Sequence, residues 1–327
     1  MPDIGPIKQP TARIPEAPMI EKRFQSQPKL QSNNSLHFMA VTAAVVFWSI
    51  SFVATKIAFT TFPPFTLGAL RFILAAFLLG IVLAFQQKFL WPSPRDLVRF
   101  IGSGLLGITI YFAMENLGVK LATAADAAMI VASYPAMTML LERIIYRNAV
   151  SKVRLFGAAI AIFGVYWIAR ESSHTGSEHR LLGDILLAVT GIVWAFYNFV
   201  TRKVVHRYPA ILITFYQTTA GALAFLPLAW IERSQWKTPT GNSLFALLYL
   251  GLFCSTIAFF LYAYGLKKLT SSSAVSLMNL VPVLGVLFAL IFLHEPLSGF
   301  QLIGGIVVIA GIMLSVGQEN KNRNQER

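Results

Sequence analysis

The sequence predicts an all-α membrane protein with ten transmembrane helices, arranged as two inverted-topology five-helix repeats. Three observations predict this fold: long uncharged apolar segments, an internal repeat, and basic residues gathered on one side. The chain has 327 residues, of which 56% are hydrophobic and only 13% are charged. A soluble domain carries about twice that charged fraction. Apolar runs of about 18 residues or more are long enough to cross the hydrocarbon core of a bilayer, so lipid is the expected solvent.

Ten hydrophobic segments follow one another along the chain. Backbone groups in lipid must be hydrogen-bonded within their own segment, so segments of this length are expected to be helices. Prolines such as Pro209 and Pro296 mark the short connections between them. The predicted helices cover residues 37–59, 64–86, 98–118, 124–147, 153–169, 181–201, 210–230, 243–263, 271–293 and 299–317.

The two ends of the chain differ in composition from the apolar part. Residues 1–35 hold six prolines among polar and basic residues, and they lack the apolar centre of a signal peptide. We expect a disordered cytoplasmic tail there. Residues 318–327 are expected to form a second, short cytoplasmic tail. Between the tails, the first repeat is expected at residues 36–170 and the second at residues 180–317.

Basic residues indicate how the chain is oriented in the membrane. If the N-terminus is inside, the cytoplasmic connections and tails hold 20 Lys and Arg residues, and the opposite side holds five. Lys and Arg near helix ends favour the cytoplasmic side. Both termini are therefore expected in the cytoplasm, with the chain in the inner membrane. The net charge of +13 does not indicate a nucleic-acid partner, because no basic helix with interleaved aromatic residues occurs.

An internal repeat relates the two halves of the chain. A shift of 147 residues aligns the third to fifth segments with the eighth to tenth without gaps, and a shift of 146 aligns the first two with the sixth and seventh. Each half has five spans, an odd number, so the second half must enter the membrane from the opposite side. The matched pairs include Trp48 with Trp194, Thr55 with Thr201, Lys56 with Arg202, Pro63 with Pro209, Thr109 with Thr256, Gly118 with Gly265, Pro135 with Pro282, Gly157 with Gly304, and Gly164 with Gly311.

Several of these segments resemble the EamA domain of the drug/metabolite transporter superfamily. The stretch Trp48–Lys56, then Pro63 and Leu70-Arg71-Phe72, is similar to the opening of that domain. So are Asn116–Pro135 with the Gly157–Gly164 helix and, in the second copy, Pro282, His294-Glu295-Pro296-Leu297 and Gly304–Gly311. The resemblance covers residues from about 40 to 317. It implies ten helices and carriage of small metabolites, often export of amino acids or related compounds.

The chain departs from a symmetric pattern at two positions. Asn148 stands in the first half where Glu295 stands in the second, so the acidic loop residue occurs once. Gln217 stands in the second half where Arg71 stands in the first. Any use of that arginine is therefore expected to be asymmetric.

Four ionisable residues lie in the apolar spans of the first half. A charge inside a span is costly, so it usually faces a cavity or a partner. We expect Lys56, Arg71, Glu115 and Asp126 to form a charged vestibule on the outer side, where Arg71 and Lys56 attract a substrate carboxylate. The alternative is that Lys56 extends to the membrane surface and that Arg71 pairs permanently with Glu115.

Two semi-polar stripes on the first and sixth helices are the main candidates for substrate binding. The spacing i, i+3 and i+7 places three side chains on one helical face, and the repeat sets the two stripes opposite each other. They are expected to line a cavity with aromatic walls, although such residues also bond helices together. The candidates are Trp48, Ser51 and Thr55 in the first stripe and Trp194, Tyr197, Asn198 and Thr201 in the second, with Asn116, Ser276 and Asn279 as further candidates.

Prolines and glycines indicate bends and close packing. Pro135 and Pro282 fall in the middle of the fourth and ninth spans, where proline kinks a helix; they are expected to be hinges or static bends. Gly157 and Gly164, like Gly304 and Gly311, lie seven residues apart on one face, which favours close helix packing. A homodimer through such a face stays open.

These features favour a secondary transporter that moves a small polar metabolite, such as an amino acid, by alternating access. Proton coupling through Glu115 or Asp126 and uncoupled facilitation both stay open. The alternative transport function is efflux of lipophilic cations. An intramembrane enzyme or a scaffold is the alternative of a different class, but no span centre holds a histidine that could serve as a base. The five histidines and Cys254 have no metal-ligand spacing, so neither a metal nor a cofactor is expected.

Overall fold

Helices account for nearly all of the described chain, and no strand occurs in it. The computed structural model describes residues 34–86, 89–147, 150–174, 178–265, 269 and 277–325. Within these residues eight helical segments are long and apolar enough to cross a membrane, and two shorter apolar helices, Leu280–Leu293 and Gly299–Ser315, follow. The prediction of an all-α membrane protein is confirmed. The candidate Ser276 and the start of the predicted ninth span lie outside the described residues.

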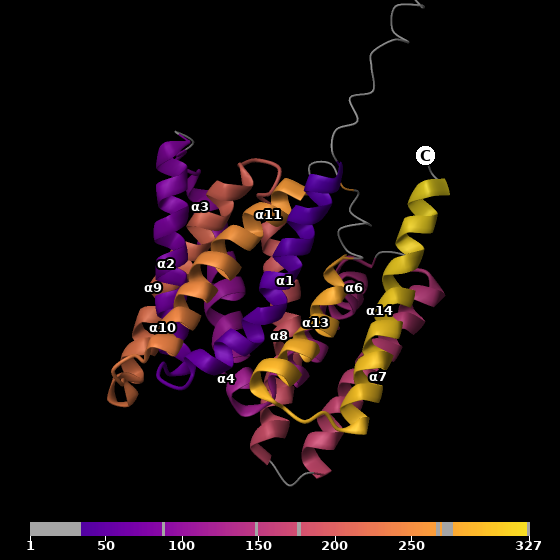
Figure 1. Ribbon diagram of the computed structural model, residues 1–327. Coiled ribbons are helices and arrows are strands. Elements are labelled where there is room, and N and C mark those ends of the chain that lie inside the picture. The colour runs from indigo at the N-terminus through magenta and orange to yellow at the C-terminus, as the bar shows by residue number, and fades with distance from the viewer. Residues whose placement is uncertain are drawn as a thin grey trace, which may run out of the picture. The chain divides into compact units, whose positions relative to one another are not determined.

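The first half contains five spans, three of them each formed by one helix (Figure 1). The third span is continuous but changes its winding between residues 105 and 110, and the fourth is broken near residue 132. Its elements are α1 (Asn34–Ala58), α2 (Pro64–Phe85), α3 (Pro94–Gly104), η1 (Leu105–Ile110), α4 (Tyr111–Leu121), α5 (Ala124–Val131), α6 (Tyr134–Tyr146) and α7 (Lys152–His174).

The second half repeats this pattern. The last helix continues to Gln325, so the predicted C-terminal tail is helical over its described part. The elements are α8 (Glu178–Thr201), α9 (Ala210–Ile231), η2 (Arg233–Gln235), α10 (Gly241–Leu248), η3 (Tyr249–Ile257), α11 (Ala258–Gly265), α13 (Leu280–Phe288), η4 (Ala289–Leu293) and α14 (Gly299–Gln325).

Two widened turns of π-helix occur at equivalent places in the two halves. The segment η1 lies inside the third span and η3 inside the eighth, and the shift of 147 residues carries η1 onto the second part of η3. A π-turn releases backbone groups from the regular helical pattern and is frequent at functional sites. Both segments border the cavity described below. Apolar periodicity does not distinguish a π-turn from an α-turn, so these segments were not predicted.

Both mid-span prolines lie at helix boundaries. The helix α5 ends at Val131, and α6 begins at Tyr134 with Pro135 in its first turn. In the second half, α13 begins at Leu280 and Pro282 is also in the first turn. Proline lacks a backbone N–H but is tolerated in a first helical turn, where that donor has no helical partner. Each predicted kink is thus a break that starts a new helix.

Equivalent helices of the two halves pack antiparallel. A Cβ added to Gly157 of α7 would lie 2.7 Å from the carbonyl oxygen of Gly311 in α14, and one added to Gly164 would lie 2.9 Å from that of Gly304. The earlier glycine of one helix thus meets the later glycine of the other, and Figure 1 shows the two helices side by side. Helices related by the repeat run in opposite directions here, as an inverted topology requires.

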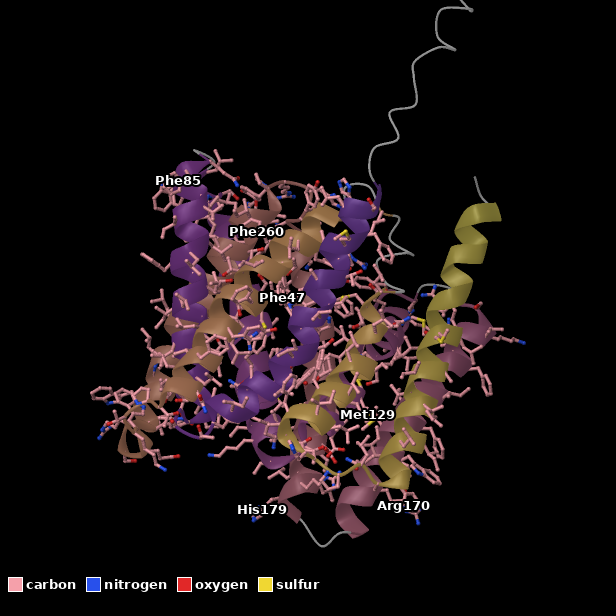
Figure 2. All side chains as sticks on the ribbon, in the orientation of Figure 1. Phe47, Phe85, Met129, Arg170, His179 and Phe260 are labelled. Atoms are coloured by element: carbon pink, nitrogen blue, oxygen red, sulfur yellow. The ribbon has the colours of Figure 1, made fainter. Side chains whose placement is uncertain are left out.

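The outer surface of the bundle is apolar. Phe77, Phe156 and Leu223 are at least 60% exposed, and Figure 2 shows such side chains standing out from the helices. A water-soluble monomer does not expose an apolar surface of this extent. The surface fits a surrounding lipid.

The glycine contacts predict the effect of adding one methyl group. Gly157→Ala places a Cβ within 3 Å of the α14 backbone, so α7 and α14 must separate. We expect a loss of about 1–3 kcal/mol of stability, measured as a lower thermal unfolding temperature of the purified protein in detergent. Gly102→Ala is the matched control, because nothing lies within 4 Å of its added Cβ and alanine favours a helix. Equal destabilisation by both substitutions would contradict the close-packing role.

Candidate functional site

A cavity of about 400 Å³ lies between the two halves of the bundle. Elements of both halves contribute to its wall, including α1 and α4 from the first and α8 and η3 from the second. Ten aromatic side chains form much of this wall. They are Trp48, Phe52, Phe72, Tyr111, Phe112, Tyr134, Trp194, Tyr197, Phe259 and Tyr262.

Most of the predicted stripe residues lie on this wall. Trp48 donates from Nε1 to the carbonyl oxygen of Cys254, 3.1 Å away, which fixes its indole ring. Trp194 lies against Tyr111 and Tyr197, with ring centroids 5.4 and 5.0 Å apart. The predicted residues on the wall are Trp48, Ser51, Thr55, Arg71, Glu115, Pro135, Trp194 and Tyr197.

Arg71 is the buried cation of the cavity. Arg71 belongs to α2 and is only 7% exposed. Its Nε donates to Ser255 Oγ of η3 at 2.7 Å, and its guanidinium lies 4.8 Å from the centre of the Phe112 ring. The aromatic contact gives a cation–π attraction. Hydrogen bonding to a neutral serine leaves the positive charge available to an anionic group.

Glu115 places a carboxylate on the same wall. Tyr111, one turn earlier in the same span, donates to Glu115 Oε1 at 3.0 Å. Glu115 and Arg71 both line the cavity, but the described residues contain no ion pair between them within 4.0 Å. The permanent Arg71–Glu115 pair considered from the sequence is therefore not formed.

Gln217 occupies the position in the second half that corresponds to Arg71. Its Nε2 donates to Ser103 Oγ at 2.8 Å and to Thr201 Oγ1 at 2.9 Å, and its Oε1 accepts from Tyr197 at 3.2 Å. The neutral amide of Gln217 thus links α3, α8 and α9. The equivalent position of the first half carries the charge of Arg71. The asymmetry expected from the sequence carries through to the cavity wall.

Other predicted residues have different partners. Asn116 donates to the carbonyl oxygen of Pro64 at 2.9 Å and is buried beside the start of α2. Asn198 donates to the carbonyl oxygen of Trp194 in its own helix. Asn279 lies in the turn before α13 and not on the cavity wall. A polar side chain in a span can satisfy itself on a backbone carbonyl, which spacing alone does not reveal.

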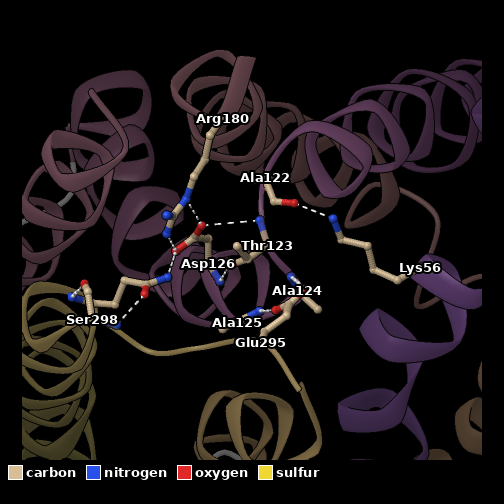
Figure 3. Close-up of polar contacts among 10 residues, drawn as sticks. Lys56, Ala122, Thr123, Ala124, Ala125, Asp126, Arg180, Glu295 and Ser298 are labelled. Carbon is tan, nitrogen blue, oxygen red and sulfur yellow. Dashed lines mark hydrogen bonds and ion pairs between the residues drawn. The ribbon is translucent and has the colours of Figure 1, made fainter. Parts of the chain in front are cut away.

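The expected four-residue vestibule is divided between two places. Arg71 and Glu115 line the cavity, whereas Lys56 and Asp126 lie at one end of the bundle. There Asp126 accepts from Arg180 Nε at 2.9 Å and from Gln301 Nε2 at 2.7 Å. Figure 3 shows this group, which we call the Asp126 cluster. Its members are Lys56, Thr123, Asp126, Arg180, Glu295 and Gln301.

The sequence pattern missed several wall residues. The repeat identified Gln217 as the counterpart of Arg71 but did not by itself place it on the wall. Tyr111 lies four residues before Glu115, a helical spacing at which side chains meet. Ser255, Tyr134 and Tyr262 carry no such signal, because single polar or aromatic residues in an apolar span occur on every face.

A second hollow of about 470 Å³ opens on the surface at the ends of α6 and α8. It is lined by Tyr146, Phe199, Arg202 and Lys203. Arg202 is paired there with Glu142 at 2.6 Å. None of the predicted site residues lies on its wall, so the cavity between the two halves is the better candidate site.

Known proteins resemble this chain over most of its length. One is a transporter of Archaeoglobus fulgidus, 27% identical over 88% of this chain and 100% of that protein. A protein of Streptantibioticus cattleyicolor named "Probable terminal-alkyne amino-acid exporter" is 26% identical over 88% of this chain and 95% of its own length. A protein of Salmonella typhimurium named "Probable amino-acid metabolite efflux pump" is 26% identical over 85% of this chain and 94% of its own.

The fold also occurs in a crystal structure. That protein superposes with a TM-score of 0.60 at 21% identity, and the match covers 86% of this chain and 97% of the other. The model of the EamA-like transporter family matches twice, over residues 36–170 and 181–317. These two matches cover most of the chain, so the resemblance noted in its motifs is confirmed. This chain belongs to the EamA-like transporter family.

Proposed function

We propose that this transporter exports a small zwitterionic metabolite with an apolar side chain, such as an amino acid, across the inner membrane. The observation that carries the proposal is that Arg71 and Glu115 line one aromatic cavity without forming an ion pair with each other. A buried charge is costly unless a partner compensates it. A zwitterion supplies a carboxylate for Arg71 and an ammonium group for Glu115, so it compensates both.

The aromatic wall suits the apolar part of such a substrate. Ligand sites are commonly cavities of about 300–1,000 Å³ with apolar walls and a few polar groups, and the volume of about 400 Å³ falls in this range. The names of the relatives from Streptantibioticus cattleyicolor and Salmonella typhimurium, an exporter and an efflux pump of amino-acid compounds, support this substrate class and direction.

Transport proceeds in this proposal by alternating access. Inverted repeats that exchange conformations open a central site to each side in turn, and the breaks before Pro135 and Pro282 are the proposed hinges. Both termini face the cytoplasm, as the basic residues indicate. The surface at the Asp126 cluster then faces outward.

The first test measures efflux of amino acids with apolar side chains from proteoliposomes. We expect Arg71→Gln to reduce efflux of the best substrate by roughly 10- to 100-fold, because a hydrogen bond to a charged group contributes about 1.5–3 kcal/mol. The decarboxylated amine of that substrate should be insensitive to Arg71→Gln. The deaminated acid should likewise be insensitive to Glu115→Gln.

Arg95→Gln is the matched control for Arg71→Gln, because Arg95 is exposed at the start of α3 and should leave efflux unchanged. If Arg71→Gln reduces transport of the amine as strongly as that of the amino acid, Arg71 does not bind the carboxylate. If no amino acid with an apolar side chain is transported, the proposed substrate class is wrong.

Efflux of lipophilic cations is the second candidate, and Glu115 beside aromatic rings favours it. Such a wall attracts cations, but Arg71 repels them. We expect tetraphenylphosphonium efflux to be low in the wild type, to rise in Arg71→Gln, and to fall again in Arg71→Gln/Glu115→Gln. If the wild type exports tetraphenylphosphonium as fast as any amino acid, the drug-efflux alternative is favoured.

A further inference from the structure

The Asp126 cluster joins the two repeats through reciprocal contacts. Asp126, from the first repeat, accepts hydrogen bonds from Arg180 and Gln301 of the second. Glu295, from the second repeat, accepts from the backbone N–H groups of Ala124 and Ala125 of the first, at 3.1 and 3.2 Å. Each repeat therefore supplies a carboxylate that the other repeat satisfies (Figure 3).

The contacts of Asp126 are buried and specific. Its side chain is 0% exposed, and Arg180 approaches it with two nitrogens, at 2.9 and 3.1 Å. Thr123 and Asp126 also cap the first turn of α5. Glu295 lies at the same helix start, where the helix dipole favours a negative charge. A two-nitrogen contact of Arg with a carboxylate is strong and restricts geometry, so the cluster holds one relative position of the two repeats.

The cluster lies next to one end of the cavity wall. Lys56 follows the wall residue Thr55 and donates to the carbonyl oxygen of Ala122, which lies one turn beyond the wall residue Val119. Small residues at the cluster and in the following turn of α5 are buried: Ala122, Ala125 and Ala128 are each less than 5% exposed. A Cβ added to Gly285 of α13 would lie 2.7 Å from that of Ala128. The helices around this end are in direct contact.

The repeat places no carboxylates at the equivalent positions of the other half. The shift of 147 residues sets Ser273 opposite Asp126 and Asn148 opposite Glu295. The positions equivalent to the two carboxylates of the cluster are thus both neutral residues. The sequence of the other half therefore supplies no carboxylate at either equivalent position.

We propose that the Asp126 cluster is the outer gate of this transporter, whose contacts break when the cavity opens to that side and form again when it closes. This inference rests on the alternating access proposed above. Passage of a metabolite requires the helix ends to separate by several ångströms, and hydrogen bonds do not persist beyond about 3.5 Å. Because the charged contacts exist only in the closed arrangement, they shift the population toward it.

The experiment measures access to the cavity from each side. A cysteine is introduced by Val119→Cys in a Cys254→Ala background, since Cys254 is the chain's single cysteine. A membrane-impermeant cationic methanethiosulfonate is then added to intact cells or to inside-out vesicles. Asp126→Asn and Glu295→Gln should each raise the rate of cysteine modification from the cluster side. For Asp126→Asn we expect an increase of at least about tenfold, because Arg180 then loses the carboxylate of its buried ion pair. The reversed pair Asp126→Arg/Arg180→Asp should restore the low rate.

Asp96→Asn is the matched control. Asp96 is a buried carboxylate at the opposite end of the third span, bonded to Arg99, Arg207 and Tyr208. The Asp96→Asn variant should not raise the rate of cysteine modification from the cluster side. Rates are measured only for variants that elute as a single folded species in detergent, and Glu295→Gln, the milder change, keeps the test decisive if Asp126→Asn does not fold.

The outcomes separate the gate from the proposed cargo. Unchanged rates in folded Asp126→Asn or Glu295→Gln would overturn the gate, as would an equal increase in Asp96→Asn, and neither result bears on amino-acid efflux by the wild type. An increase confined to the cluster variants supports the gate even if the cargo is not an amino acid.

Discussion

The fold depends on antiparallel contact between helices in a solvent that cannot hydrogen-bond the backbone. Lipid forces each span to satisfy its own N–H and C=O groups, so the structure is built of helices. Lipid also provides no hydrophobic drive between helices, so tight van der Waals contact must hold them. Glycines provide that contact where Gly157 meets Gly311 and Gly164 meets Gly304. Because these positions are equivalent in the repeat, the same contact that holds the bundle also orients its halves.

Because lipid cannot hydrogen-bond them, polar side chains inside the bundle must either bond within the protein or face the cavity. Asn116 and Asn198 bond to backbone carbonyls and are thereby satisfied, whereas Arg71 and Glu115 keep charges directed at the cavity. The two groups of charges have different roles in our proposal. Those in the cavity select a substrate, and those of the Asp126 cluster select a conformation. A transporter needs both, because a site that never closes on one side would be a channel.

The asymmetry between the repeats is as informative as their similarity. Gln217 is hydrogen-bonded to Ser103, Thr201 and Tyr197. The equivalent position of the first repeat is Arg71, which carries a charge. Glu295 receives the N–H groups of α5, and its counterpart in the sequence is the neutral Asn148. A symmetric duplication would bind and close equally at both ends. The substitutions give the cavity one cationic wall and leave the carboxylates of Asp126 and Glu295 at one end, whereas the opposite end has a different charged contact, between Asp96 and Arg207.

The sequence by itself determined the helical class, the family and the stripe residues Trp48, Ser51, Thr55, Trp194 and Tyr197, which lie on one cavity wall. These follow from length, periodicity and the repeat, which are local or translational properties of the chain. The tertiary structure alone decided the partner of each polar group: Arg71 bonds Ser255, and Asp126 bonds Arg180 and Gln301. Those contacts join residues 54 to 184 positions apart. Helix spacing predicts which face a side chain occupies, but only packing brings a particular partner within hydrogen-bonding distance.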